Sequence, residues 1–297
     1  MWEKNRFLPY LVAVGVALAP LPAFAVAEKQ DGFSLENLSI GLEFNYLNKG
    51  LDATTAISGT GRLPGVGTFT SEVENSVDRV KLTEVLARVN YQVNDHFTPY
   101  LLLGTSGLAF DDRYRLNLDS LRSVDTNVPY SDSFSLGYGI GAEGVLMELP
   151  AEMKLTYGVR MFTFKSSDSA AVPPQEISSF LTQINPVEKV DFSTDATYRE
   201  WDVSFGVSRE FELGDGFSVT PQLGYRHSSI SLKTSTDVEY SPGVPYYLQG
   251  TFDRSLGGSL SSVTLGVTGG YLDYLVATLV LAVGDETGIT LAVTYGF

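Results

Sequence analysis

Short segments in which apolar and polar residues alternate are the feature of this sequence that most constrains its fold. Residues 288–297 show it most clearly: one face carries Ile289, Leu291, Val293, Tyr295 and Phe297, and the other carries Thr290, Ala292, Thr294 and Gly296. A period of two residues is that of a β-strand, whose successive side chains point to opposite faces. A strand with one apolar face and one small or polar face predicts a sheet that has lipid on one side and a polar interior on the other.

Ten segments of this kind follow one another along the chain. They are residues 38–46, 82–92, 97–110, 134–146, 154–161, 198–212, 218–232, 260–268, 274–283 and 288–297. Leu101, Leu102 and Leu103 fill both faces of the third segment, so its phase stays open. The pattern predicts an all-β chain that forms a single antiparallel up-and-down transmembrane β-barrel of about ten strands, in which the last strand pairs with the first.

The connections between these segments alternate in length. Long loops are expected at residues 49–77, 111–132, 166–197 and 233–258, and a short one at 284–287. Short turns are expected at residues 94–96, around Pro150, at 214–216, and at Gly269-Gly270 with Asp273. This alternation is typical of a barrel with extracellular loops on one side of the membrane and periplasmic turns on the other.

The amino-terminal residues have the organisation of a secretory signal peptide. Lys4 and Arg6 precede an uncharged stretch that ends in small residues suited to cleavage after Ala25 or Ala27. We therefore expect residues 1–25 to be the signal and 26–297 to be one barrel domain. A retained membrane helix is the alternative, but three prolines interrupt the stretch: Pro9, Pro20 and Pro22.

Composition excludes several classes of function. A formal net charge of −15 does not suit a nucleic-acid-binding surface. Two histidines and no cysteine supply a transition-metal site poorly, and no cofactor is expected. The segment 139–144 matches G-x-G-x-x-G, but it lies within an alternating strand and does not open a helix, so it does not predict a dinucleotide site.

The alternating strands, short turns such as residues 91–97, and the ending Thr-Tyr-Gly-Phe resemble the small OmpA-like and OmpX-like barrels of Gram-negative outer membranes, in their ten-stranded size class. The resemblance implies localisation in the cell outer membrane, in contact with outer-membrane lipid and lipopolysaccharide. It also implies that Tyr295 and Phe297 are an assembly signal, recognised by the barrel-assembly machinery through the terminal strand.

If the phases are right, charged side chains of both signs line the lumen. We expect a structural ion-pair network that fills a polar interior, and the alternative is a narrow, charge-selective channel. The predicted lumen-lining residues are Glu43, Glu84, Arg88, Glu143, Lys154, Arg160, Glu200, Asp202 and Arg226.

One amphipathic helix is expected within the loop 166–197. Ile177, Phe180, Leu181 and Ile184 follow Pro173-Pro174 at the spacing of one helix face. This apolar stripe suits packing on the barrel mouth; a plug or a partner-binding surface is the functional alternative.

Two enzyme families invite comparison. Asp111-Asp112 suits the acidic pair of the omptin proteases, but Tyr225 stands two residues before His227, where that family has the acid of its Asp-His dyad. His227-Ser228-Ser229 is similar to the His-x-Ser element of lipid A deacylases, with Glu239 as the acid, although Ile230 replaces the usual Asn.

The leading hypothesis is a non-enzymatic outer-membrane barrel with a structural or surface-interaction role and an extracellular ligand at its long loops. A small passive pore and a lipid A-modifying hydrolase that uses His227 and Ser229 are the alternatives.

Overall fold

A computed structural model describes residues 34–63, 67–119, 122–132, 134–172, 190–240, 249–272 and 274–297. The expected signal peptide at residues 1–25 and the expected helix at Ile177, Phe180, Leu181 and Ile184 lie outside these ranges. No helix in the described part of the chain is long and apolar enough to cross a membrane.

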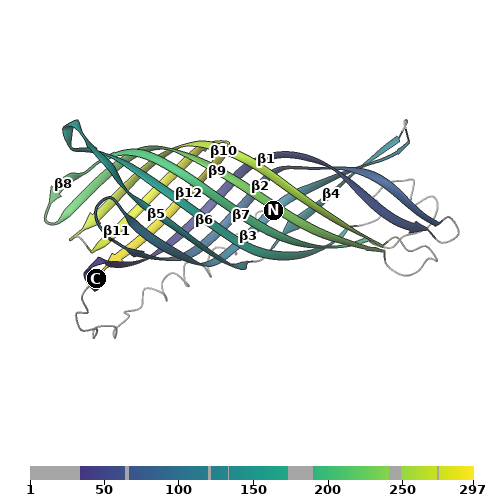
Figure 1. Ribbon diagram of the computed structural model, residues 1–297, viewed down its shortest axis with the longest axis horizontal. Coiled ribbons are helices and arrows are strands. Elements are labelled where there is room, and N and C mark those ends of the chain that lie inside the picture. Colours follow the sequence, from purple (N-terminus) through teal and green to yellow (C-terminus); the bar gives the residue numbers. More distant parts are fainter. Residues whose placement is uncertain are drawn as a thin grey trace, which may run out of the picture. The chain divides into compact units, whose positions relative to one another are not determined.

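The described residues form two short 3₁₀-helices, η1 (Leu35–Asn37) and η2 (Pro150–Glu152), and a set of antiparallel strands. The strands are β1 (Leu38–Leu63), β2 (Gly67–Tyr91), β3 (Thr98–Asp119), β4 (Arg122–Ser131), β5 (Ser135–Leu149), β6 (Met153–Val172), β7 (Val190–Arg209), β8 (Phe211–Gly214), β9 (Phe217–Tyr240), β10 (Gln249–Tyr271), β11 (Leu275–Gly284) and β12 (Glu286–Gly296). Figure 1 shows them crossing the barrel wall diagonally.

The sheet closes on itself. β12 pairs with β1 from Ser39↔Gly296 to Lys49↔Glu286, as predicted, and every other neighbour in the ring is antiparallel. β4 and β5 pair with successive segments of the same edge of β3, so together they occupy one position in the barrel wall. In the same way, β7 and β8 pair with successive segments of the same edge of β9. The twelve strands therefore make ten positions around the barrel, and the prediction of an all-β, ten-stranded antiparallel barrel is confirmed.

The alternating pattern explains which way the side chains point. On β1, Leu42, Phe44 and Tyr46 face outward, while Glu43 and Asn45 are buried inside. β3 resolves the phase that its sequence left open: Leu101 and Leu103 are 60% and 57% exposed on the outside, whereas Leu102 is 2% exposed within. The period of two residues thus holds even where leucines occupy both faces.

One end of the barrel carries the short connections, and we call it the turn end. Its turns lie at residues 92–97, at η2 and at 214–216, and Tyr274 donates to the Leu272 carbonyl at the same end. Gly214 and Gly216 adopt φ of 91° and 78°, which a residue with a Cβ rarely tolerates. The expectation that Gly269 and Gly270 form a turn is wrong, because both still pair with β11 inside β10.

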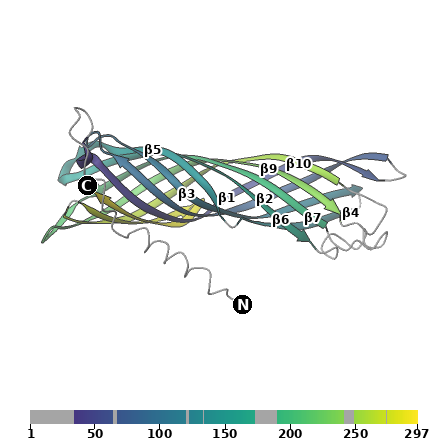
Figure 2. The ribbon, with the colours of Figure 1, turned by 90° about the horizontal axis from the view of Figure 1, so that it is seen from below.

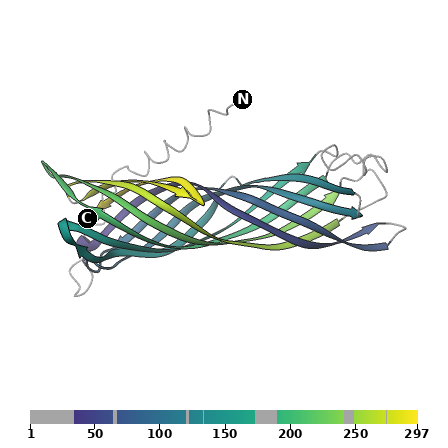
Figure 3. The ribbon, with the colours of Figure 1, turned by 90° about the horizontal axis from the view of Figure 1, so that it is seen from above.

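At the opposite end, which we call the hairpin end, the structure differs from the predicted loops. β1 and β2 remain paired as far as Leu63↔Gly67, so most of residues 49–77 is strand. The same correction applies to much of the other long loops, which continue β3 and β4, β6 and β7, and β9 and β10. The connection between β11 and β12 is short, and Figure 3 shows this yellow hairpin ending before its neighbours.

The polarity of the alternation reverses toward the hairpin end, and this reversal explains the missed strands. On β7 the outward residues change from Phe205 and Trp201 to Arg199, while the inward residues change from Asp202 to Tyr198. A pattern that is apolar outside becomes one that is apolar inside. A search for strands with apolar residues on the outer face therefore finds only the turn-end half of each strand. The hairpin-end half, with its apolar residues on the inner face, is then predicted as a loop.

Beyond the β11–β12 hairpin the wall divides into two four-stranded sheets. The β5–β6 ladder stops at Gly137↔Phe164, and the described residues show no ladder between β4 and β6 or between β1 and β10. One sheet is β1-β2-β3-β4 and the other is β6-β7-β9-β10. Figure 2 shows strands of both sheets extending to the hairpin end. Their buried apolar residues give this half the inside-out polarity of a water-soluble β-sandwich.

Candidate functional site

Inward side chains from six strands meet in the middle of the barrel and form what we call the charged layer. Its members are Glu43 and Lys49 of β1, Glu84 of β2, Arg160 of β6, Glu200 and Asp202 of β7, Arg226 of β9, and Glu286 of β12. Each lies on the inward face of its strand, so the period of two residues brings them together across the lumen.

Arg160 joins the two acidic residues of β1 and β2. Its guanidinium lies 3.3 Å from Glu43 and 2.8 Å from Glu84. The Asn45 amide donates to the same two carboxylates, at 2.7 and 2.8 Å, and its own carbonyl accepts from the Thr290 hydroxyl at 2.6 Å. The acids are therefore held by one cation and one neutral amide.

Lys49 and Arg226 organise the remaining acids. The Lys49 ammonium pairs with Glu200 and, at 2.7 Å, with Glu286. Arg226 lies 2.9 Å from Asp202, 3.1 Å from Glu286 and 3.5 Å from Glu200. Because Glu200 and Glu286 each contact both cations, β1, β7, β9 and β12 are linked in a single cluster.

The charged layer contains five carboxylates and three cations, and neutral donors add to the pairing of the carboxylates. Asn45 supports Glu43 and Glu84, and the Tyr198 hydroxyl donates to Glu200 at 2.9 Å. Buried charges are tolerated only when paired and hydrogen-bonded, and removal of one partner is costly. The arrangement can hold the barrel in one geometry.

Three of the predicted lumen residues lie outside this layer, toward the turn end. Arg88 pairs with Glu143 at 2.5 Å, and its guanidinium carbon lies 3.8 Å from the centre of the Tyr100 ring. Lys154 is half-exposed, with its ammonium 4.0 Å from Glu210. Lys154 is thus on the rim and does not contribute to the central cluster.

A second layer lies on the hairpin side of the charges, and we call it the apolar layer. On three strands the next inward residue toward the hairpin end is apolar or aromatic: Leu82 after Glu84, Phe162 after Arg160, and Tyr198 after Glu200. Each member is at most 6% exposed, and the members are Leu51, Val80, Leu82, Leu108, Phe110, Phe162, Phe164, Tyr198, Ile230, Leu232 and Leu256. The interior therefore differs from a lumen filled by polar side chains alone.

Aromatic contacts join the two layers and continue beyond them. Arg160 lies 5.0 Å from the Phe162 ring, and Phe164 stands 6.0 Å from Phe162 and 5.2 Å from Tyr198, measured between ring centres. These aromatic side chains fill the lumen of the barrel at this level.

Beyond the apolar layer, the two sheets are joined by an ion pair. Arg254 of β10 contacts the Asp112 carboxylate of β3 with both terminal nitrogens and also contacts Thr234. Phe110 and Tyr130 stack at 4.5 Å beneath it, and the Tyr130 and Ser166 hydroxyls are 2.5 Å apart. Asp112 therefore serves a sheet-to-sheet contact instead of standing in an exposed acidic pair.

Sequence reasoning missed Lys49, Glu286 and Arg254. All three fall in segments expected to be loops, yet Lys49 is in phase with Glu43 and Asn45, and Glu286 is in phase with Thr290. These residues would be predicted to face inward if the two-residue alternation were continued beyond the point where the apolar face changes from outside to inside.

The residues considered for lipid hydrolysis are not brought together. His227 and Ser229 lie on the outer face of β9, and His227 Nδ1 is 3.3 Å from the Ser261 hydroxyl of β10. Glu239 belongs to the same strand, twelve positions beyond His227, which at about 3.3 Å per residue is roughly 40 Å away. A Ser-His-acid arrangement therefore does not form from these three residues. Among the described side chains, no group of three His, Cys, Asp or Glu is placed to hold a metal ion.

The terminal aromatic residues lie at the turn end. Phe297 and Tyr295 have ring centres 5.5 Å apart, and Tyr295 is 5.8 Å from Tyr274. Both terminal rings are exposed on the outer face. They contribute to an aromatic band that also includes Phe217 and Tyr271.

No protein-family model and no curated protein matches this chain. Solved structures with a similar barrel include the outer membrane protease OmpT of Escherichia coli, with a TM-score of 0.45, 10% identity, and coverage of 91% of this chain and 100% of that one. The β-domain of the Bordetella autotransporter BrkA gives a TM-score of 0.41 at 14% identity, with coverage of 87% and 98%. The Pseudomonas putida toluene transporter TodX gives 0.33 at 10% identity, with coverage of 87% and 89%.

Proposed function

We propose that this protein is an integral outer-membrane barrel with a closed lumen and a structural or surface-interaction role. The outward face of the turn-end half carries large apolar side chains in a continuous band, including Leu101, Leu136, Met161 and Leu223. A water-soluble protein rarely exposes so extensive an apolar surface, whereas a lipid bilayer requires one. Outer-membrane lipid, including lipopolysaccharide, is the partner that this band fits.

The turn end faces the periplasm in this proposal and the hairpin end faces the exterior. The short turns and the expected signal peptide support this orientation. Tyr295 and Phe297, exposed at the turn end, suit recognition by the assembly machinery during insertion.

The observation that carries the closed-lumen proposal is the pair of layers across the barrel. Conduction needs a continuous path wide enough for water. The charged layer is joined across the lumen by Arg160, Lys49 and Arg226, and the apolar layer beyond it contributes rings and leucine side chains with almost no exposed area.

The two sheets of the hairpin end are then the part available to other molecules. Their outer faces expose acidic residues, among them Asp111, Asp195 and Asp253, in a chain of net charge −15. Exposed cations, among them Lys165, Arg199 and Lys233, lie on the same faces, so these faces can contact ligands of either sign. The proposal includes no enzymatic activity and no pore.

Planar-bilayer recording tests the closed lumen. Refolded protein, with a porin of known conductance as the control for sensitivity, is expected to insert without producing single-channel steps. Insertion is followed in parallel by the heat-dependent change in gel mobility of a folded barrel. Reproducible steps of one size from folded protein would contradict the proposal and favour the passive pore.

A further inference from the structure

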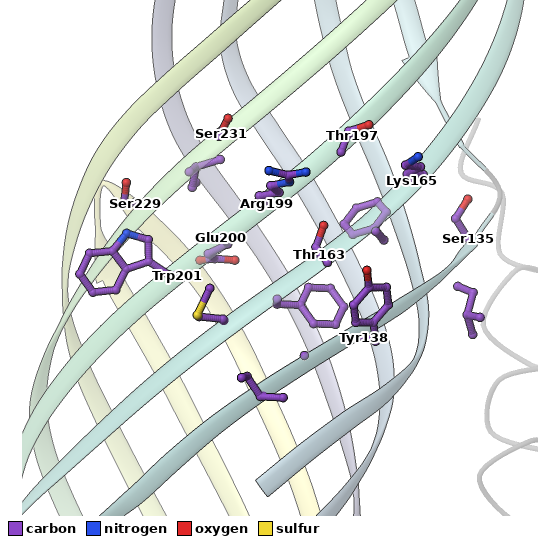
Figure 4. A pocket seen from close by; sticks show the side chains of 17 residues that line it. Ser135, Tyr138, Thr163, Lys165, Thr197, Arg199, Glu200, Trp201, Ser229 and Ser231 are labelled. Carbon is purple, nitrogen blue, oxygen red and sulfur yellow. The ribbon is translucent and has the colours of Figure 1, made fainter. Parts of the chain in front are cut away.

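A groove of about 840 Å³ crosses the outer face of β5, β6, β7 and β9. Figure 4 shows its side chains, with Trp201 on one side, Tyr138 on the other, and Arg199 and Lys165 along one edge. Five apolar residues that line it are 51–67% exposed: Leu136, Tyr138, Ile140, Met161 and Trp201. The groove therefore has an apolar part and a cationic edge.

The register of β6, β7 and β9 arranges these residues in rows. Met161, Trp201 and Ser229 form one row, followed toward the hairpin end by a row of Thr163, Arg199 and Ser231 and then by a row of Lys165, Thr197 and Lys233. The next row contains Asp195 between Ser167 and Ser235. Polarity thus changes from apolar to cationic to acidic over four rows, of which the first and last lie six residues apart on each strand.

The cations in these rows are available to a ligand. Arg199, Lys165 and Lys233 are all exposed, and none forms an ion pair with any side chain that the structure describes. Three neighbouring cations without an ion-pair partner among the described side chains would gain from an anionic ligand. Asp195, one row further out, would repel an anion and confine it to the cationic rows.

We propose that this groove binds the phosphorylated headgroup of an outer-leaflet glycolipid, an inference that rests on the membrane location proposed above. Phosphate oxygens pair with the guanidinium of Arg199 and the ammonium groups of Lys165 and Lys233. The hydroxyls of Thr197 and Ser231 are suited to sugar hydroxyls, and the Thr163 hydroxyl, which donates to the Tyr198 carbonyl at 2.8 Å, can accept from one. Acyl chains lie against Met161, Trp201 and Tyr138. The Trp201 and Tyr138 rings occupy the boundary between apolar and polar surface, where amphipathic side chains are favoured.

Free phosphate does not match the whole groove, because a phosphate ion has no apolar group that could contact the apolar side chains of the groove. A glycerophospholipid has an anionic headgroup and acyl chains but presents fewer sugar-like hydroxyls to the three polar rows. The combination of cations, hydroxyl side chains and apolar surface therefore favours a phosphorylated saccharide headgroup with several acyl chains.

Native mass spectrometry of the full chain in detergent, titrated with bisphosphorylated lipid A, tests the assignment. Triple substitution of Arg199, Lys165 and Lys233 by Gln is expected to weaken binding about tenfold or more, since each charge-assisted contact contributes at this order. The matched control replaces two other exposed outward cations, Arg79→Gln and Lys81→Gln, and is expected to bind as the wild type does.

Three outcomes would overturn the proposal: equal weakening in the triple variant and the control, equal affinity for dephosphorylated lipid A, or equal affinity for phosphatidylglycerol. Folding and insertion are measured on the same samples by gel mobility. Loss of insertion would count against the membrane barrel itself, whereas normal insertion without lipid selectivity would count only against this groove.

Discussion

Lys49 shows most clearly how a single residue depends on the surrounding layer. Its ammonium is fully buried and pairs with both Glu200 and Glu286, which also contact Arg226. Without Lys49, Glu200 and Glu286 would depend on Arg226, which also pairs with Asp202. A buried charge that loses its partner costs far more than an exposed one, because water cannot replace the lost interaction.

Replacement of Lys49 by Met, which keeps the side-chain length but removes the charge, is expected to lower the free energy of unfolding by about 3–5 kcal/mol. Urea titration of the protein in phospholipid vesicles, monitored by gel mobility, measures this free energy of unfolding. Lys81→Met is the control, because Lys81 lies exposed on the outer face, and it is expected to change stability by less than about 0.5 kcal/mol. Equal stability of the two variants would show that the charged layer does not depend on this cation.

At the same scale, the sequence predicted only part of the site. Glu43, Glu84, Arg160, Glu200, Asp202 and Arg226 could be placed inside because each has at least one outward apolar or aromatic neighbour along its strand. Lys49 could not be placed inside, because Leu47 and Leu51 also face inward there. The inner face is therefore no longer polar, whereas the sequence pattern of the first part of β1 requires a polar inner face. Side-chain pairing across the lumen depends on strand tilt and stagger, which no local pattern specifies.

At the scale of single strands, close approach between neighbours limits which residues fit. A Cβ built on Gly104 of β3 would lie 2.1 Å from the Val85 carbonyl oxygen and 2.8 Å from the Leu86 Cα of β2. Both are backbone atoms, so no side-chain rotation can relieve the contact. By contrast, nothing lies within 4 Å of a Cβ built on Gly269 of β10.

Gly104→Ala is therefore expected to destabilise the barrel by about 1–3 kcal/mol, because β2 and β3 must move apart. Gly269→Ala, the matched control, is expected to be neutral or stabilising by about 0.5–1 kcal/mol, since alanine loses less backbone entropy in a strand. Chemical denaturation of both variants in the same vesicles compares them. A Gly104→Ala variant as stable as Gly269→Ala would mean that the two strands are not held at this separation.

The reversal of alternation within each long strand also explains the limits of prediction for elements. Ten strands, their order and their outward faces follow from the membrane half, where apolar residues face out. The hairpin-end halves of β1, β2, β3, β6, β7, β9 and β10 were expected as loops, because their apolar residues face in and their outward residues resemble loop composition. Such a strand can be predicted over its full length only if the two-residue alternation is followed whichever face carries the apolar residues.

At the scale of the whole molecule, one barrel wall has two surroundings. The turn-end half has an apolar exterior and a charged interior, and the hairpin-end half has a polar exterior and a mainly apolar interior that the Arg254–Asp112 ion pair crosses. The apolar layer is the start of the second half. The proposed membrane anchoring, closed lumen and display of two outer sheets would all follow from this one change in the pattern.

Single-cysteine labelling along β10 tests this claim most directly, because the chain contains no cysteine of its own. A fluorescent probe on Leu265→Cys is expected to be quenched by brominated lipids and not by aqueous iodide, and a probe on Ser255→Cys is expected to show the reverse. Leu256→Cys, buried in the apolar layer, is expected to resist labelling until the protein is unfolded. Labelling of folded Leu256→Cys as fast as Ser255→Cys, or lipid quenching at Ser255→Cys, would contradict the reversal and the closed lumen.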